Sequence, residues 1–192
     1  MLGRIIEALA RLMAILGGLV LSALVVMTCL SITGRFLNGI LHSDALVGTG
    51  LSDWLLALGI GPVEGDFELI EAGMAFVIFA FLPITQLRDG HASVDILTNL
   101  FGERANRFLV ALWAVLFAAV MVLIAWQLWQ GTQDKMRYGE TTYLIQFPVW
   151  WAYAAALAGA TVTALVALYV MLVRLAELVT GSPILVSEGA EH

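Results

Sequence analysis

The chain has 192 residues, of which 61% are hydrophobic and only 12% are charged, and its mean hydropathy is +0.94. Soluble domains carry about 45–50% apolar and about 25% charged residues, so this composition excludes an ordinary water-soluble domain. The net charge is −6, with nine Lys and Arg residues and no basic run, which argues against nucleic acid as a partner.

Four apolar segments are long enough to cross a bilayer, for which a helix needs about 20 residues. They are residues 12–34, 69–87, 108–133 and 148–173. The first segment is longer than the h-region of a cleaved signal peptide, about 7–15 residues, so we expect it to be retained. We therefore predict an all-α integral membrane protein with four transmembrane helices in a single membrane domain, 1–192.

The placement of Lys and Arg predicts that both termini are cytoplasmic, because cytoplasmic segments carry an excess of these residues. With the N-terminus inside, the cytoplasmic segments hold six of the nine: Arg4, Arg11, Arg88, Arg104, Arg107 and Arg174. The opposite side then holds only Arg35, Lys135 and Arg137.

Two connections between the spans have the pattern of short amphipathic helices that lie in the membrane interface. The first is the segment at about 51–58, where Trp54, Leu55 and Leu58 are the predicted interfacial anchors. The second is the segment at about 93–101, which Ser93 is expected to cap.

Stripes of small residues predict where helices pack closely, because small side chains let helix backbones approach in lipid. In the fourth span alanines recur every four residues, at Ala152, Ala156, Ala160 and Ala164. In the first span Ala14, Gly18 and Ser22 form a similar stripe.

Glu68 and Glu71 are three residues apart and therefore share one helix face at the external edge of the second span. Two interpretations are open: a site for a coupling ion or proton, or interface residues that reach lipid headgroups or a partner's polar groups. No catalytic motif and no metal-ligand spacing accompanies the other polar residues. We expect no cofactor in this chain and no enzymatic activity.

An acidic residue precedes the second span and a short motif follows it: Glu68 or Glu71, then Arg88, Gly90, His91, Val94 and Asp95. In these residues the chain resembles the small, DctQ-like membrane subunit of tripartite ATP-independent periplasmic (TRAP) transporters. A second matching stretch, which leads into the fourth span, comprises Thr141, Thr142, Leu144, Phe147, Pro148, Val149 and Trp150.

The resemblance implies a bacterial or archaeal inner-membrane protein that scaffolds a large membrane subunit. That large subunit is expected to hold sodium and substrate and to work as an elevator. A periplasmic substrate-binding protein is expected to deliver an organic acid. The motif residues are expected to have structural or partner-contact roles, with His91 and Asp95 fixing the connection between spans two and three or its contact with the large subunit. Membrane lipid is the remaining expected partner.

Two alternative functions are open on the residues alone. The first is a membrane-anchor subunit of an oxidoreductase complex, although no pair of histidines lies within the spans to hold haem. The second is an independent small transporter or membrane enzyme, although no repeated halves with broken helices are visible.

Overall fold

The computed structural model describes residues 2–43, 50, 54, 57, 59, 61–88 and 103–180. Within these residues, four helices are long and apolar enough to cross a membrane. They are α1 (Leu2–Leu41), α3 (Asp66–Leu87), α5 (Glu103–Tyr138) and α6 (Val149–Thr180). The predicted all-α fold class with four transmembrane helices is confirmed.

The helices are longer than the apolar segments that predict them. At 1.5 Å per residue, the 40 residues of α1 extend about 60 Å, whereas the hydrocarbon core of a bilayer is about 30 Å thick. Polar residues continue α1 beyond the apolar run, and near its start Arg11 donates to Glu7, one turn earlier, at 3.1 Å. The shortest of the four, α3, has 22 residues and extends about 33 Å.

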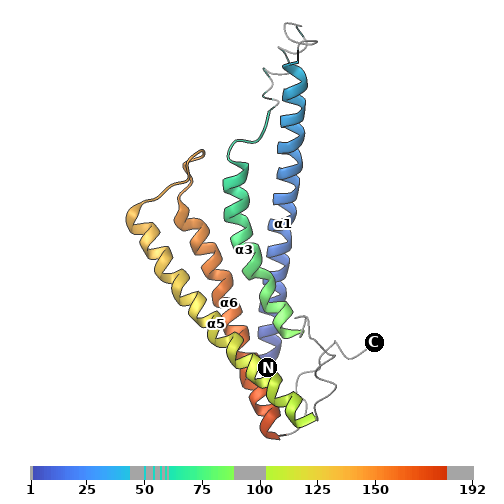
Figure 1. Ribbon diagram of the computed structural model, residues 1–192, viewed down its shortest axis with the longest axis vertical. Coiled ribbons are helices and arrows are strands. Elements are labelled where there is room, and N and C mark those ends of the chain that lie inside the picture. The colour runs from blue at the N-terminus through green and yellow to red at the C-terminus, as the bar shows by residue number, and fades with distance from the viewer. Residues whose placement is uncertain are drawn as a thin grey trace.

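The helices are arranged as an open row in the order α1, α3, α6, α5 (Figure 1). Helix α3 packs between α1 and α6, and α6 packs between α3 and α5. In the most apolar stretch of α6, 44% of the residues are buried, whereas in that of α1 only 11% are buried. Helix α6 is therefore the centre of the packing, and α1 and α5 are edges with long exposed apolar sides.

The start of α1 and the end of α6 lie at the same end of the row, as an even number of crossings requires (Figure 1). We call this the terminal end. At the opposite end α1 stops, α3 begins, and residues 139–148 connect α5 to α6. We call it the hairpin end.

The contact between α1 and α3 is close at Gly17 and not at Gly18, which belongs to the small-residue stripe predicted for the first span. A Cβ on Gly18 would meet no atom within 4 Å, whereas a Cβ on Gly17 would lie 2.8 Å from the Cβ of Ala80. Consecutive helical residues point about 100° apart, so only one of the two glycines can face α3. The prediction at Gly18 is wrong by one position.

The predicted alanine stripe of α6 lies along the inner side of the row. Ala156, Ala160 and Ala164 are buried, and Ala152 is half-buried. Beside this stripe, a Cβ on Gly159 would lie 2.8 Å from the Cβ of Phe79, so α3 and α6 approach closely there.

A proline inside α3 creates a polar link to α6. Pro83 has no N–H, so the carbonyl of Phe79, four residues earlier, loses its usual helical donor. The buried hydroxyl of Thr163 in α6 lies 3.0 Å from this carbonyl and 2.9 Å from the carbonyl of Gly159 in its own helix. Such hydroxyls let membrane helices tolerate proline, because lipid offers no alternative donor.

Replacing Thr163 by valine is expected to lower the free energy of unfolding by about 1 kcal/mol, because the Phe79 carbonyl loses its donor in lipid. Unfolding of the purified protein by detergent titration measures this change. The matched control is Thr161→Val, because Thr161 is exposed on the same helix and bonds only the carbonyl of Leu157. Equal losses in the two variants would contradict a role for the link between helices.

Candidate functional site

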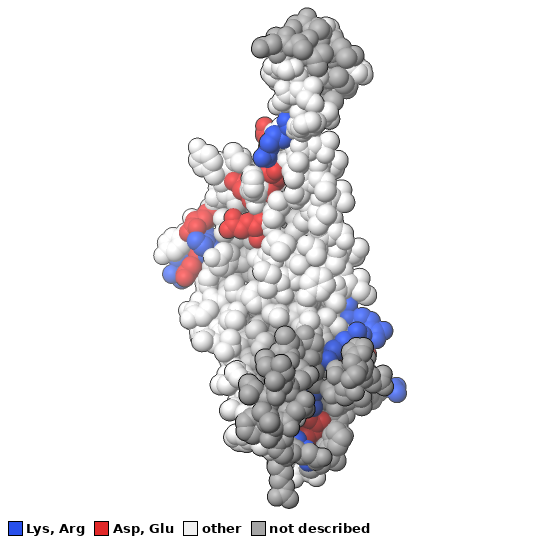
Figure 2. Space-filling view, turned by 45° about the vertical axis from the view of Figure 1, so that its right-hand side comes forward, with Lys and Arg blue, Asp and Glu red and all other residues white. Residues whose placement is uncertain are grey.

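The charged residues of the described chain gather at its ends. Figure 2 shows Asp and Glu side chains concentrated toward the hairpin end, above a broad uncharged band. Three of these acids, Asp66, Glu68 and Glu71, belong to the first turns of α3. Their carboxylates have three different environments.

The carboxylate of Asp66 is buried and links α3 to α1. The hydroxyl of Ser31 donates to its Oδ2 atom at 2.5 Å, and the guanidinium of Arg35 donates to the same atom at 3.2 Å. Its Oδ1 atom accepts the backbone N–H of Phe67 at 2.9 Å. Hydrogen bonds to a charged group contribute about 1.5–3 kcal/mol each, and together these contacts offset the cost of burying the carboxylate.

The carboxylate of Glu68 links α3 to the connection between α5 and α6. Its Oε1 atom accepts the backbone N–H of Leu144 at 2.7 Å, and its Oε2 atom accepts that of Ile145 at 3.1 Å. The side chain of Ile145 is packed so closely against Gly65 that a Cβ there would overlap it. Gly65 also has a φ of +72°, so a glycine is required at this turn on two counts.

Residues 139–148 form a compact hairpin. Thr141 and Pro148 are bridged in antiparallel fashion, and the N–H of Thr142 donates to the carbonyl of Phe147 at 2.9 Å. The hydroxyl of Thr142 accepts the N–H of Phe147 in return, at 3.0 Å. The tip is the exposed part, where Tyr143 is 91% and Leu144 is 63% exposed. Internal bonds and the Glu68 carboxylate thus hold a tip that faces outward.

Glu71 is exposed and lines a cavity of about 350 Å³ between α3, α5 and α6. Small residues of α3 and α6, among them Ala75 and Ala152, form much of its wall, and Thr142 and Phe147 of the hairpin border it. We call it the wedge cavity. Within the described part of the chain, no ion pair or hydrogen bond engages the Glu71 carboxylate.

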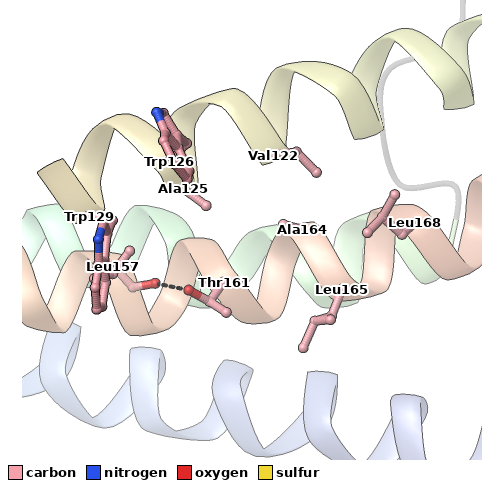
Figure 3. Close-up of a pocket in the computed structure, with 9 residues that line it drawn as sticks. All are labelled: Val122, Ala125, Trp126, Trp129, Leu157, Thr161, Ala164, Leu165 and Leu168. Carbon is pink, nitrogen blue, oxygen red and sulfur yellow. Dashed lines mark hydrogen bonds between the residues drawn. The ribbon is translucent and has the colours of Figure 1, made fainter.

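A second cavity, also of about 350 Å³, is an apolar groove between α5 and α6. Trp126 and Trp129 of α5 and Leu157 and Leu165 of α6 border it, with Ala164 among the residues between them (Figure 3). The hydroxyl of Thr161 in this groove is already bonded to the Leu157 carbonyl at 2.8 Å. The groove can accept apolar atoms but offers no reactive group.

The motif that follows the second span lies mostly outside the described residues. Arg88 is described: its N–H donates to the carbonyl of Ile84 at 3.2 Å and caps α3, and its side chain is exposed. Outside the described residues lie Gly90, His91, Val94 and Asp95, together with the predicted interfacial segment 93–101. In the other predicted interfacial segment Trp54 is 61% exposed, while Leu55 and Leu58 are again outside the described residues.

Sequence reasoning missed several residues that position this end of the molecule. One cluster joins Asp66 of α3 to Ser31 and Arg35, which lie one turn apart on α1. Asp66 is more than 30 positions away from both of them in the sequence. That i, i+4 pair on α1 was a usable signal, because it places a hydroxyl and a guanidinium on one helix face. The group on α3 that the pair engages is decided only by tertiary packing.

Across the described ranges, no group of three or more His, Cys, Asp or Glu side chains is close enough to hold a metal ion.

A family model described as "Tripartite ATP-independent periplasmic transporters, DctQ component" matches residues 24–178, which is most of the chain. No curated protein and no solved structure matches the chain.

Replacing Glu68 by alanine is expected to release the hairpin, because two amides lose a charged acceptor. Hydrogen exchange at Leu144 and Ile145 should become at least about tenfold faster, given the strength of such bonds. Hydrogen–deuterium exchange with mass spectrometry measures this over residues 139–148. Glu64→Ala is the control, since Glu64 is an exposed carboxylate on the turn just before α3. Unchanged exchange in Glu68→Ala would contradict the assigned contact.

Proposed function

Because the chain belongs to the DctQ component family and is therefore a small membrane subunit of a TRAP transporter, we propose that it is the static scaffold of that transporter. In this proposal a large sodium-coupled subunit carries the substrate and sodium sites and moves as an elevator. A periplasmic binding protein delivers the substrate, an organic acid. The present chain contributes no transport site and holds its partner in position.

The observation that carries this proposal is the open row of helices. A row leaves both edge helices with long apolar sides, and in α5 these include Trp113, Leu123 and Trp126. Apolar surface of this kind is normal against lipid and equally available to the helices of a membrane partner. The open row therefore supports a role in which this chain packs beside a membrane partner and enlarges the static part of the complex.

The lengths and directions of the helices also support a static role. An elevator subunit exerts force on its neighbour as it crosses the bilayer, so a scaffold has to resist displacement along the membrane normal. The 40 residues of α1 and the 36 of α5 extend about 60 Å and about 54 Å, well beyond the hydrocarbon core. Helices α5 and α6 also lean relative to α1 (Figure 1). Moving such helices would drag polar ends into lipid, which is costly.

We also propose that the terminal end of the row faces the cytoplasm of a bacterial or archaeal cell and that the hairpin end faces the periplasm. The distribution of Lys and Arg supports this orientation. The hairpin and the start of α3 would then lie on the side where a binding protein arrives.

Replacing Trp54, Leu55 and Leu58 together by glutamine is expected to lower uptake at least about twofold while the complex with the large subunit still assembles. The reason is that the proposed interfacial anchor loses its apolar face. Uptake in cells and the yield of the co-purified complex measure the two effects. Val179→Gln is the control, since Val179 is exposed near the end of α6. Normal uptake in the triple variant would contradict the anchoring role.

The proposed function itself is tested by affinity purification of the tagged chain from its native membrane. We expect a larger multi-span protein to co-purify, and proteoliposomes of both to take up a labelled organic acid under a sodium gradient when a binding protein is added. Omitting this chain should abolish uptake. Uptake by this chain alone would establish an independent transporter instead, and a Soret absorbance band would establish an oxidoreductase anchor.

A further inference from the structure

The wedge cavity exists because α3 and α5 diverge toward the hairpin end. Deeper in the row, Phe79 of α3 packs against a buried cluster that contains Ala118 and Met121 of α5 and Ala164 of α6. Nearer the hairpin, the cavity of about 350 Å³ lies between α3, α5 and α6, and α6 packs against both of the other two helices. Phe79 forms the base of the cavity, and the hairpin borders its other end.

The lining of the cavity is amphipathic along its length. Ala72 and Ala75 on α3 and Ala152 and Ala156 on α6 line its apolar part, which we call the slot. The carboxylate of Glu71 stands at the end nearer the hairpin. From Glu71 to Phe79 the helix rises about 12 Å, so the slot continues well below the charged group.

The described chain leaves the apolar slot unfilled and offers the Glu71 carboxylate no bonded partner. An apolar slot of this size loses dispersion contacts if it is empty, and water lacks polar partners in its depth. No ion pair engages the Glu71 carboxylate within the described residues, while the neighbouring Glu68 carboxylate already accepts two backbone amides. A carboxylate at the edge of a membrane span normally faces a cation, a polar group or water.

We propose that the wedge cavity binds one phospholipid that carries a primary amine in its headgroup. The ammonium group bonds the Glu71 carboxylate, and one acyl chain lies along Ala72 and Ala75 toward Phe79. The volume falls in the range of a single small-molecule site, about 300–1,000 Å³. It is smaller than one turn of a helix, since a turn 5.4 Å long and about 10 Å in diameter takes about 420 Å³. A lysine of a partner chain would reach only the mouth and leave the slot vacant. The proposal does not depend on the transport role.

Native mass spectrometry of the purified full chain tests the proposal with three probes of identical acyl chains: phosphatidylethanolamine, phosphatidylcholine and phosphatidylglycerol. We expect phosphatidylethanolamine to bind about tenfold more tightly than phosphatidylglycerol, because a charged donor on Glu71 is worth about this factor. Phosphatidylcholine has a cationic headgroup without N–H donors and should bind with intermediate affinity.

Two variants and a control make the outcome specific. Glu71→Gln should remove the preference for phosphatidylethanolamine, whereas Glu64→Gln, which changes an exposed carboxylate outside the cavity, should keep it. Ala75→Phe should fill the slot and weaken binding of all three lipids at least about fivefold. Equal binding of the three lipids by the unaltered chain, or an unchanged preference in Glu71→Gln, would overturn the proposal. If Ala75→Phe does not fold, the Glu71→Gln comparison still decides it.

Discussion

The crossing of α3 and α6 is the contact on which the described structure depends. Helix α1 packs mainly on α3, and α5 packs on α6, so this crossing is what joins the two helix pairs into one row. It combines a close backbone approach at Gly159 with the bond between Thr163 and the Phe79 carbonyl that Pro83 leaves open. Lipid provides no apolar driving force between helices, so close packing and interhelical hydrogen bonds such as that of Thr163 become decisive.

At the hairpin end, two of the acids of α3 bind neighbouring parts of the chain and hold them in place. Asp66 fastens α3 to α1, and Glu68 fastens α3 to the hairpin between α5 and α6, so consecutive acids connect the two sides of the row. Both oxygens of Glu68 are occupied by amides, which favours a structural role over a coupling-ion site for this residue. Glu71 is different, because its carboxylate faces a cavity and remains available to a group from outside the described chain.

The open row of helices and the family membership are both consistent with a subunit of a larger membrane complex. As a small membrane subunit of a TRAP transporter, the chain presents several surfaces through which the proposed scaffold role can act. The available surfaces are the apolar edges of α1 and α5, the groove between α5 and α6, the wedge cavity and the projecting hairpin tip. Lipids and partner helices can both occupy apolar surfaces of this kind, and a lipid in the wedge cavity would fill the space that α3, α5 and α6 leave near the hairpin.

The sequence by itself determined the four spans, the all-α class and the family resemblance, because a membrane helix is recognisable from a local run of apolar residues. It also placed the alanine stripe of α6, since small residues at a spacing of four stand out in one helix. Only the tertiary structure decided the order of the row, the use of Gly17 in place of Gly18, and the partners of Asp66, Glu68 and Thr163. In lipid nearly every helix face is apolar, so periodicity does not reveal which faces meet. The pairing of Glu68 with amides 76 and 77 positions away therefore has no local signature.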